Sequence, residues 1–373
     1  MNEPENKLAQ EGGRRAMIGR LRALLGTAPD LLHRYEAAKD VVRCFRRPAF
    51  YEVATRCNLF CEGCYYFSDS RVEVAEETSL EAWERFFRAE AARGVTMAYF
   101  VGAEPALEQE RLIAASACFP YGNIGTNGTI RIDPAVPYRI GLSVWAGDDA
   151  TDTLLRGGST FRKAIANYRG DPRAIVLYTF TRRNLAGARR VAEICRDNGL
   201  ELTFNMYSPT STYLSRLEHW QGNDRRYFRF SRPQDTLIFD DDSLAAVRRE
   251  ANRLIEDFPG TVVYSRAYND WVTRPGPLHR LDPVTGIASD CRSRILAPMT
   301  YHRTDLSRAD EKCCTSDVDC SQCRMYSGGW SSRFEPRAED LRDRASFEDW
   351  LDMMETLGRI FIRERPAAVA AAE

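Results

Sequence analysis

Residues 56–64 read Arg-Cys-Asn-Leu-Phe-Cys-Glu-Gly-Cys and place Cys57, Cys61 and Cys64 on one short loop, at the spacing Cys-x3-Cys-x2-Cys. Three thiolates on such a loop can hold three irons of a 4Fe–4S cube. No further cysteine follows until Cys118, so the fourth iron would be open to a ligand from outside the protein. Structural zinc, the alternative, usually needs four Cys or His ligands, and no histidine lies near the loop. The spacing therefore favours an iron–sulfur cluster with one open iron.

Around this loop, strand-forming runs alternate with amphipathic helices. Six strands are expected, at residues 49–54, 95–101, 121–125, 139–145, 174–180 and 200–206. Four helices are expected among them, at residues 79–93, 107–117, 161–168 and 185–198. Alternation of this kind is typical of an α/β protein with a parallel sheet.

Two more segments accompany the cysteine loop. Residues 102–105, Gly-Ala-Glu-Pro, end the second expected strand, and residues 126–129, Thr-Asn-Gly-Thr, follow the third. Together with the loop they resemble the radical S-adenosylmethionine (SAM) superfamily. The resemblance implies an α/β fold with a partial (β/α)6 barrel of TIM-like type, and a cluster whose open iron binds SAM. It also implies reductive cleavage of SAM to a 5′-deoxyadenosyl radical that removes a hydrogen atom from a substrate.

The resemblance also implies which residues contact SAM. Glu104 and the backbone of Gly102 and Ala103 would meet the SAM ammonium group, and Ser143 in the fourth strand would bond the ribose. An arginine after the fifth strand could pair with the SAM carboxylate as a bidentate fork. The full set of implied contacts is Tyr65, Gly102, Ala103, Glu104, Asn127, Ser143 and Arg182.

Each of these residues has a simpler interpretation. Glu104 could be a solvated residue of a βα loop, and Arg182 or its neighbour Arg183 a plain surface charge. Many members of the family place an aromatic residue before the last cysteine, whereas this chain has Gly63. Tyr65 would then take over the contact with adenine, or it could be a core tyrosine.

A second group of cysteines lies near the C-terminus, and four of its five members could hold a closed 4Fe–4S cube. The group consists of Cys291, Cys313, Cys314, Cys320 and Cys323. Either Cys313 or Cys314 would be the ligand that the adjacent pair contributes. This layout resembles the auxiliary-cluster domains called SPASM, with two clusters, or twitch, with one; five cysteines favour the twitch-like form. A zinc site with four cysteine ligands is the alternative.

These patterns predict four regions. Residues 1–47 form an N-terminal helical extension, and residues 48–210 form the partial barrel. Residues 211–270 form a connecting segment with a helix and a strand. Residues 271–373 form a small α+β domain for the auxiliary cluster, with a C-terminal helix.

Composition restricts the partners. The chain has 373 residues, with 52 Lys and Arg against 53 Asp and Glu, so no electrostatic footprint for nucleic acid or an anionic membrane is expected. It contains no apolar run long enough for a membrane span and no apolar signal segment. Its eleven cysteines then indicate a reducing, cytoplasmic compartment, where they serve better as metal ligands than as disulfides.

The predicted function is a radical SAM enzyme that oxidises a small metabolite in specialised biosynthesis, with the auxiliary cluster as electron acceptor. Too few residues precede the barrel for a separate peptide-recognition domain, although a peptide substrate stays open. The reductant would be a flavodoxin- or ferredoxin-type protein. One alternative is a bond-forming radical enzyme that crosslinks peptides or adds adenosyl. Another is a zinc-stabilised binding module without SAM chemistry. No catalytic base is assigned.

Overall fold

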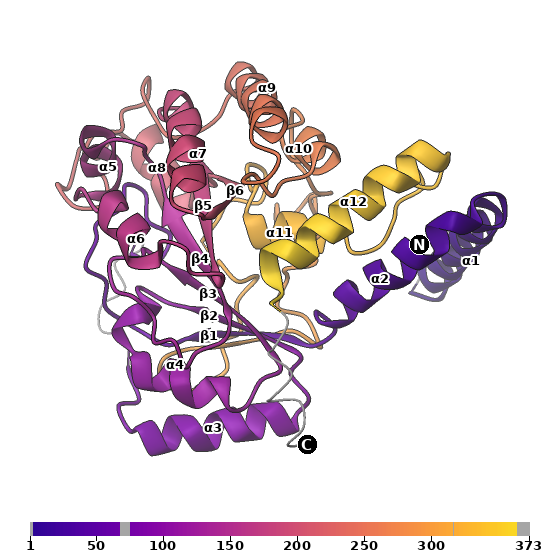
Figure 1. Ribbon diagram of the computed structural model, residues 1–373, viewed down its shortest axis with the longest axis horizontal. Coiled ribbons are helices and arrows are strands. Elements are labelled where there is room, and N and C mark those ends of the chain that lie inside the picture. The colour runs from indigo at the N-terminus through magenta and orange to yellow at the C-terminus, as the bar shows by residue number, and fades with distance from the viewer. Residues whose placement is uncertain (1–2, 68–74, 316, 364–373) are drawn as a thin grey trace.

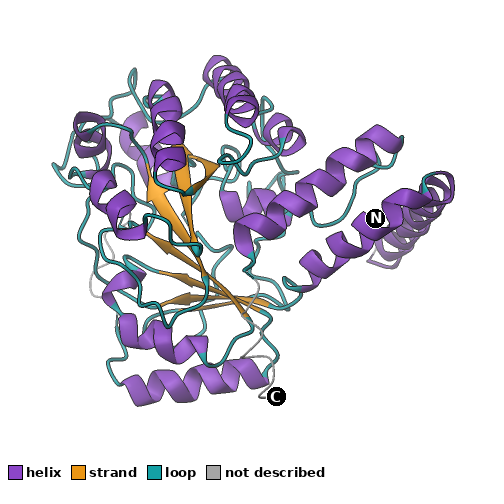
Figure 2. Cartoon of the chain, in the orientation of Figure 1, coloured by secondary structure: helices purple, strands orange, loops and turns teal. Residues whose placement is uncertain are grey.

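A parallel sheet organises the chain. In the computed structural model, which describes residues 3–67, 75–315 and 317–363, seven strands pair in the order β6-β5-β4-β3-β2-β1-β7 (Figures 1 and 2). Their bounds are β1 Pro48–Glu52, β2 Met97–Val101, β3 Tyr121–Thr126, β4 Arg139–Val144, β5 Ala174–Phe180, β6 Glu201–Met206 and β7 Thr300–His302. Every pairing is parallel. The α/β class is confirmed, and β1 to β6 lie where the sequence predicts strands.

Helices cover the outer side of the sheet, where α3, α4, α6 and α7 run beside the strands in Figure 1. The helices are α1 Glu3–Thr27, α2 Leu32–Arg43, α3 Leu80–Ala92, α4 Gln109–Ser116, α5 Asp149–Arg156, α6 Phe161–Tyr168, α7 Ala188–Asp197, α8 Ser211–Glu218, α9 Asp241–Asp257, α10 Arg266–Val272, α11 Tyr326–Ser331 and α12 Arg344–Phe361. The helix α5 is absent from the sequence prediction, and it carries a residue of the candidate site.

The C-terminal part of the chain returns to the sheet. Strand β7 pairs with β1, so that Thr300 lies beside Ala49 at the edge of the sheet. Helix α12 lies along α2 (Figure 1), where the Tyr35 ring is 6.0 Å from the Phe347 ring and Arg34 Nε donates to Glu355 at 2.7 Å. The cysteines that follow β7 are thereby held next to the first strand of the sheet.

Most large side chains of the strands and covering helices are buried in one continuous core. None of the described helices combines the length and apolar composition that a membrane crossing requires.

Candidate functional site

A cavity of about 1600 Å³, counted to its open mouth, lies against the sheet near the carboxyl ends of the strands. Inward-facing residues of β1 to β6 line it, and so do Cys314, Thr315, Met325, Tyr326, Ser327 and Phe361 from the C-terminal part of the chain. Parallel barrels and related sheets place their active sites at this end of the strands. The cavity is thus formed jointly by the sheet and the returning C-terminal segment.

All three cysteines of the first loop, Cys57, Cys61 and Cys64, line this cavity. The loop is held by its own backbone: Phe60 N donates to Arg156 O at 3.1 Å, and Glu62 N to Leu155 O at 2.8 Å. Both acceptors belong to the last turn of α5. The loop is therefore fixed to the helix that follows β4.

Gly63 occupies the position before the last cysteine of the loop, where the family resemblance leads us to expect an aromatic side chain. Its φ is +59°, and an added Cβ would lie 2.1 Å from Tyr207 Oη. The same hydroxyl donates a hydrogen bond to Gly63 O at 3.3 Å. A side chain is excluded here by both backbone conformation and space.

Gly102 and Ala103 lie at the end of β2 against the strand β1. Gly102 has φ of +122°, and an added Cβ would be 2.6 Å from Ala54 O, so only glycine fits. The amide of Ala103 donates to Ala54 O at 3.0 Å. Ala103 is not among the described residues with positive φ, so its methyl group is accommodated without strain.

Glu104 is 1% exposed and reaches the cavity wall as a fixed carboxylate. Its oxygens accept hydrogen bonds from Ala106 N at 2.9 Å, Asn127 N at 2.8 Å and Thr126 Oγ1. Burial raises the pKa of Glu104, while the hydrogen bonds from Thr126 and Asn127 act in the opposite direction. The carboxylate is thus locked in orientation, with its charge little solvated.

Asn127 joins the end of β3 to the cysteine loop. Its Nδ2 donates to Asn58 Oδ1 at 2.7 Å, and Asn58 Nδ2 donates to Thr129 Oγ1 at 2.8 Å. Ser143 lines the cavity from β4 and accepts a hydrogen bond from Trp145 Nε1 at 3.2 Å. Of the seven predicted SAM contacts, the structure brings six to the same cavity as the three cysteines: Tyr65, Gly102, Ala103, Glu104, Asn127 and Ser143.

Arg182, the seventh, does not line the cavity. Its side chain is about half exposed and pairs with Asp240 at 3.0 Å, because residues before α9 pack over the end of β5. The structure therefore does not bring Arg182 together with the other six predicted contacts.

The guanidinium in the cavity belongs to Arg156, the last residue of α5, which is 3% exposed. Arg156 Nε lies 3.4 Å from Cys61 Sγ, and another nitrogen donates to Ser143 O. Two sequence signals flank this helix: Asp148, whose carboxylate accepts from Thr151 N at 2.8 Å, and Gly157 with φ of +76°. Such N-cap and C-cap residues could have revealed α5.

A second pocket of about 440 Å³, its opening included, borders the first one. The five C-terminal cysteines, Cys291, Cys313, Cys314, Cys320 and Cys323, all line it, together with the buried His279. Cys314 and Thr315 line both pockets. Burial raises the pKa of Cys291 to about 11 and that of Cys323 to about 12. These thiols are protonated at neutral pH and would lose protons on binding a metal.

The geometry of the thiols bears on which metal they fit. Within the part of the chain that the structure describes, no three His, Cys, Asp or Glu side chains come close enough to hold a single metal ion. Tetrahedral zinc with Zn–S bonds of about 2.3 Å would require sulfurs about 3.8 Å apart. A cube separates its thiolate ligands further, because each binds a different iron.

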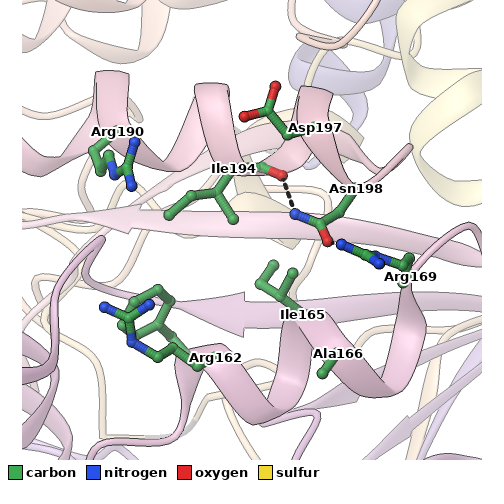
Figure 3. A pocket seen from close by; sticks show the side chains of 9 residues that line it. Arg162, Ile165, Ala166, Arg169, Arg190, Ile194, Asp197 and Asn198 are labelled. Atoms are coloured by element: carbon green, nitrogen blue, oxygen red, sulfur yellow. Dashed lines mark hydrogen bonds between the residues drawn. The ribbon is translucent and has the colours of Figure 1, made fainter.

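A surface groove between α6 and α7 is unrelated to this chemistry. Figure 3 shows Ile165 and Ile194 between Arg162, Arg169 and Arg190. Arg162 Nε lies 3.1 Å from both carboxylate oxygens of Asp149, and Arg169 Nε donates to Asn198 Oδ1 at 2.8 Å. The groove contains no cysteine and lies on the helix-covered side of the sheet.

No protein-family model matches the chain, and no curated protein matches it in sequence. Among solved structures, Streptococcus suis SuiB bound to S-adenosylmethionine is similar at 14% identity and a TM-score of 0.48, over 69% of this chain and 58% of that one. Native anSMEcpe with bound AdoMet is similar at 16% identity and a TM-score of 0.48, over 81% and 82%. HydG, a maturase of the [FeFe]-hydrogenase, gives 10% and 0.39, over 71% and 66%. Because these identities and TM-scores are low, the similarities by themselves assign no function to this chain.

We predict that Gly63→Ala destabilises the cysteine loop, by about 1–3 kcal/mol in urea unfolding, because alanine resists the positive φ and its methyl group meets Tyr207. Adding Tyr207→Phe should restore part of this loss by removing the hydroxyl. Gly260→Ala, whose methyl group meets nothing within 4 Å, is the matched control. An unfolding midpoint of Gly63→Ala equal to that of the wild type would contradict this account of the loop.

Proposed function

We propose that this protein is a radical SAM enzyme. The observation that carries the proposal is the convergence of Cys57, Cys61 and Cys64 with one buried carboxylate, Glu104, and one buried guanidinium, Arg156, in a single cavity. Three thiolates suit three irons of a cube and leave the fourth iron without a protein ligand. The two opposite charges beside them match a ligand that carries both an amino and a carboxylate group.

The side chains of the cavity divide this recognition between them. Glu104, held by Thr126 and Asn127, would receive the ammonium group of SAM, and Arg156 would receive its carboxylate. Ser143 and Tyr65 also line the cavity and could contact the ribose and the adenine. When bound, the reduced cluster and SAM supply a 5′-deoxyadenosyl radical, as the cofactor's own chemistry.

The protein's further contribution is exclusion of water. Apolar side chains of the strands, together with Met325, Tyr326 and Phe361, form most of the cavity wall. A largely apolar wall that excludes water protects a reactive species from side reactions. The C-terminal segment therefore acts as a cover in this proposal.

We also propose net oxidation of the substrate as the reaction type, with a small molecule preferred over a peptide. The supporting observation is the second cysteine pocket, which shares Cys314 and Thr315 with the first cavity. A cluster ligated there would lie next to the substrate and could accept an electron from it. A flavodoxin- or ferredoxin-type protein would supply the reducing electron. Radical bond formation, with a peptide as substrate, is the alternative.

Cys61→Ala tests the first cluster. Anaerobic reconstitution with iron and sulfide, followed by reduction with SAM, should give 5′-deoxyadenosine with the wild type and none with this variant, because one iron loses its ligand. Chromatography with mass detection measures the product. Cys118→Ala, at a half-buried cysteine outside both pockets, should behave as the wild type. Full SAM cleavage by Cys61→Ala would overturn the proposal.

Arg156→Gln should weaken SAM binding by about 10- to 100-fold, the range expected for loss of a charge-assisted hydrogen bond. Arg182→Gln should leave it unchanged, because that side chain pairs with Asp240 outside the cavity. Equilibrium dialysis with labelled SAM measures both, and iron content shows whether the neighbouring Cys61 still binds its cluster. Equal losses in the two variants would contradict the assignment of Arg156.

Cys320→Ala should remove the second cluster and lower the iron content by about four per chain, while Cys118→Ala should not. Comparing Cys313→Ser with Cys314→Ser then identifies the fourth ligand, since both thiols line the second pocket. Unchanged iron in Cys320→Ala would exclude a second cluster. Stoichiometric zinc in place of iron would favour the structural-zinc alternative.

A further inference from the structure

Two glycines leave a gap in the layer of side chains that lines the cavity. Gly125 on β3 and Gly141 on β4 are direct cross-strand partners, and both line the cavity. An added Cβ at Gly125 would meet nothing within 4 Å, and one at Gly141 would meet only Ile124 O, at 3.8 Å. Neither has positive φ, so the backbone does not require glycine at either position.

Glycine inside a strand weakens it and often marks a place where another molecule approaches the backbone. Here two such residues lie side by side in the middle of the sheet. The protein's own atoms do not use the space that they leave. The gap therefore has the properties of a floor on which part of a ligand rests.

One wall beside this floor is aromatic. The rings of Phe50 and Tyr99 stack at 4.6 Å, and the Tyr99 ring meets the Phe361 ring edge-on at 6.3 Å. Phe361 in turn lies 4.7 Å from Tyr326. All four rings line the cavity, and together they link β1 and β2 to the C-terminal segment. A flat ring resting on the floor would meet aromatic neighbours at its side.

Uncharged polar groups come from the neighbouring strands. Asn123, two residues before Gly125, faces the cavity from β3. Asn205 on β6 also faces it; its Nδ2 donates to Thr179 Oγ1 at 3.3 Å and its Oδ1 accepts from Tyr326 N at 3.1 Å. These amides and hydroxyls can bond a neutral polar edge without a full charge.

Charge distinguishes this floor from the region of the cysteine loop. Among the described residues that line the cavity, Glu104 and Arg156 alone carry a carboxylate or a guanidinium, and none is Lys, Asp or His. Both lie outside the strands, Glu104 in the loop after β2 and Arg156 at the end of α5 beside Cys61. A charged ligand group on the floor would thus be buried without a counter-charge, which is costly.

We infer that Gly125 and Gly141 form the floor of a substrate subsite that takes an uncharged aromatic ring. The assignment of this ring to the substrate rests on the proposed function. The subsite itself rests on the glycine gap, the aromatic wall and the absence of spare charge among the described lining residues. The ring belongs to a small aromatic metabolite or to an aromatic side chain of a peptide, because both present the same chemistry to this floor.

Fragment binding to the reconstituted protein tests the subsite directly. Saturation-transfer NMR with indole and phenol should show binding, whereas benzylammonium and benzoate should bind at least 10-fold more weakly. Gly125→Ala should reduce indole affinity by at least 10-fold, and Gly141→Val should abolish detectable binding. Gly260→Ala, outside the cavity and equally free of close neighbours, should bind as the wild type. Thermal melting shows that each variant remains folded.

Three results would overturn the inference: unchanged indole affinity in folded Gly125→Ala and Gly141→Val, equal binding of the charged fragments, or competitive displacement of indole by SAM. The last would assign the floor to adenine. Failure of the proposed function is distinguishable, because it appears as absent SAM cleavage whether or not indole binds. Conversely, SAM cleavage without neutral-ring binding would remove the subsite alone.

Discussion

The arrangement of the site depends on two backbone hydrogen bonds between the cysteine loop and the last turn of α5. Phe60 N and Glu62 N donate to the carbonyls of Arg156 and Leu155, so the loop cannot shift without the helix. The same turn directs the Arg156 side chain to Cys61 Sγ. The contact between the loop and α5 therefore sets the orientation of the thiols and also places the Arg156 guanidinium beside Cys61. Backbone groups are suited to this role because their directions are fixed by the chain.

A second network fixes the anionic side of the cavity. Glu104 follows β2, yet its carboxylate is held by Thr126 and Asn127 at the end of β3, and Asn127 in turn holds Asn58 in the cysteine loop. These links connect the ends of two strands to the cysteine loop through buried polar groups that satisfy one another. The distance between carboxylate and thiols is thus set by the register of β1, β2 and β3.

The sequence was sufficient for features that depend on local pattern. Strands β1 to β6 lie at runs that the sequence predicts as strands. The cysteine loop follows β1 closely in the chain, and Glu104 follows β2. It was insufficient where partners are distant: β7 has three residues and pairs with β1 across about 250 positions. Arg156 was not found for the same reason: its position beside Cys61 and the pairing of Arg182 with Asp240 both depend on tertiary packing. The role that we infer for Gly125 and Gly141 could not be predicted from the sequence, because only the strand register places the two residues side by side.

The C-terminal segment combines two roles that the structure makes interdependent. Tyr326, in the aromatic wall of the cavity, comes three residues after Cys323, and its amide donates to Asn205 Oδ1 on β6. Its neighbour Ser327 lies 3.2 Å, Oγ to Sγ, from Cys314, which lines both pockets. Metal bound by the second group of cysteines would restrain the residues that close the first cavity, because ligation fixes the backbone around each ligand. If the proposed second cluster binds there, it would hold in place the part of the cavity wall that Tyr326 and Ser327 form, in addition to any part in electron transfer.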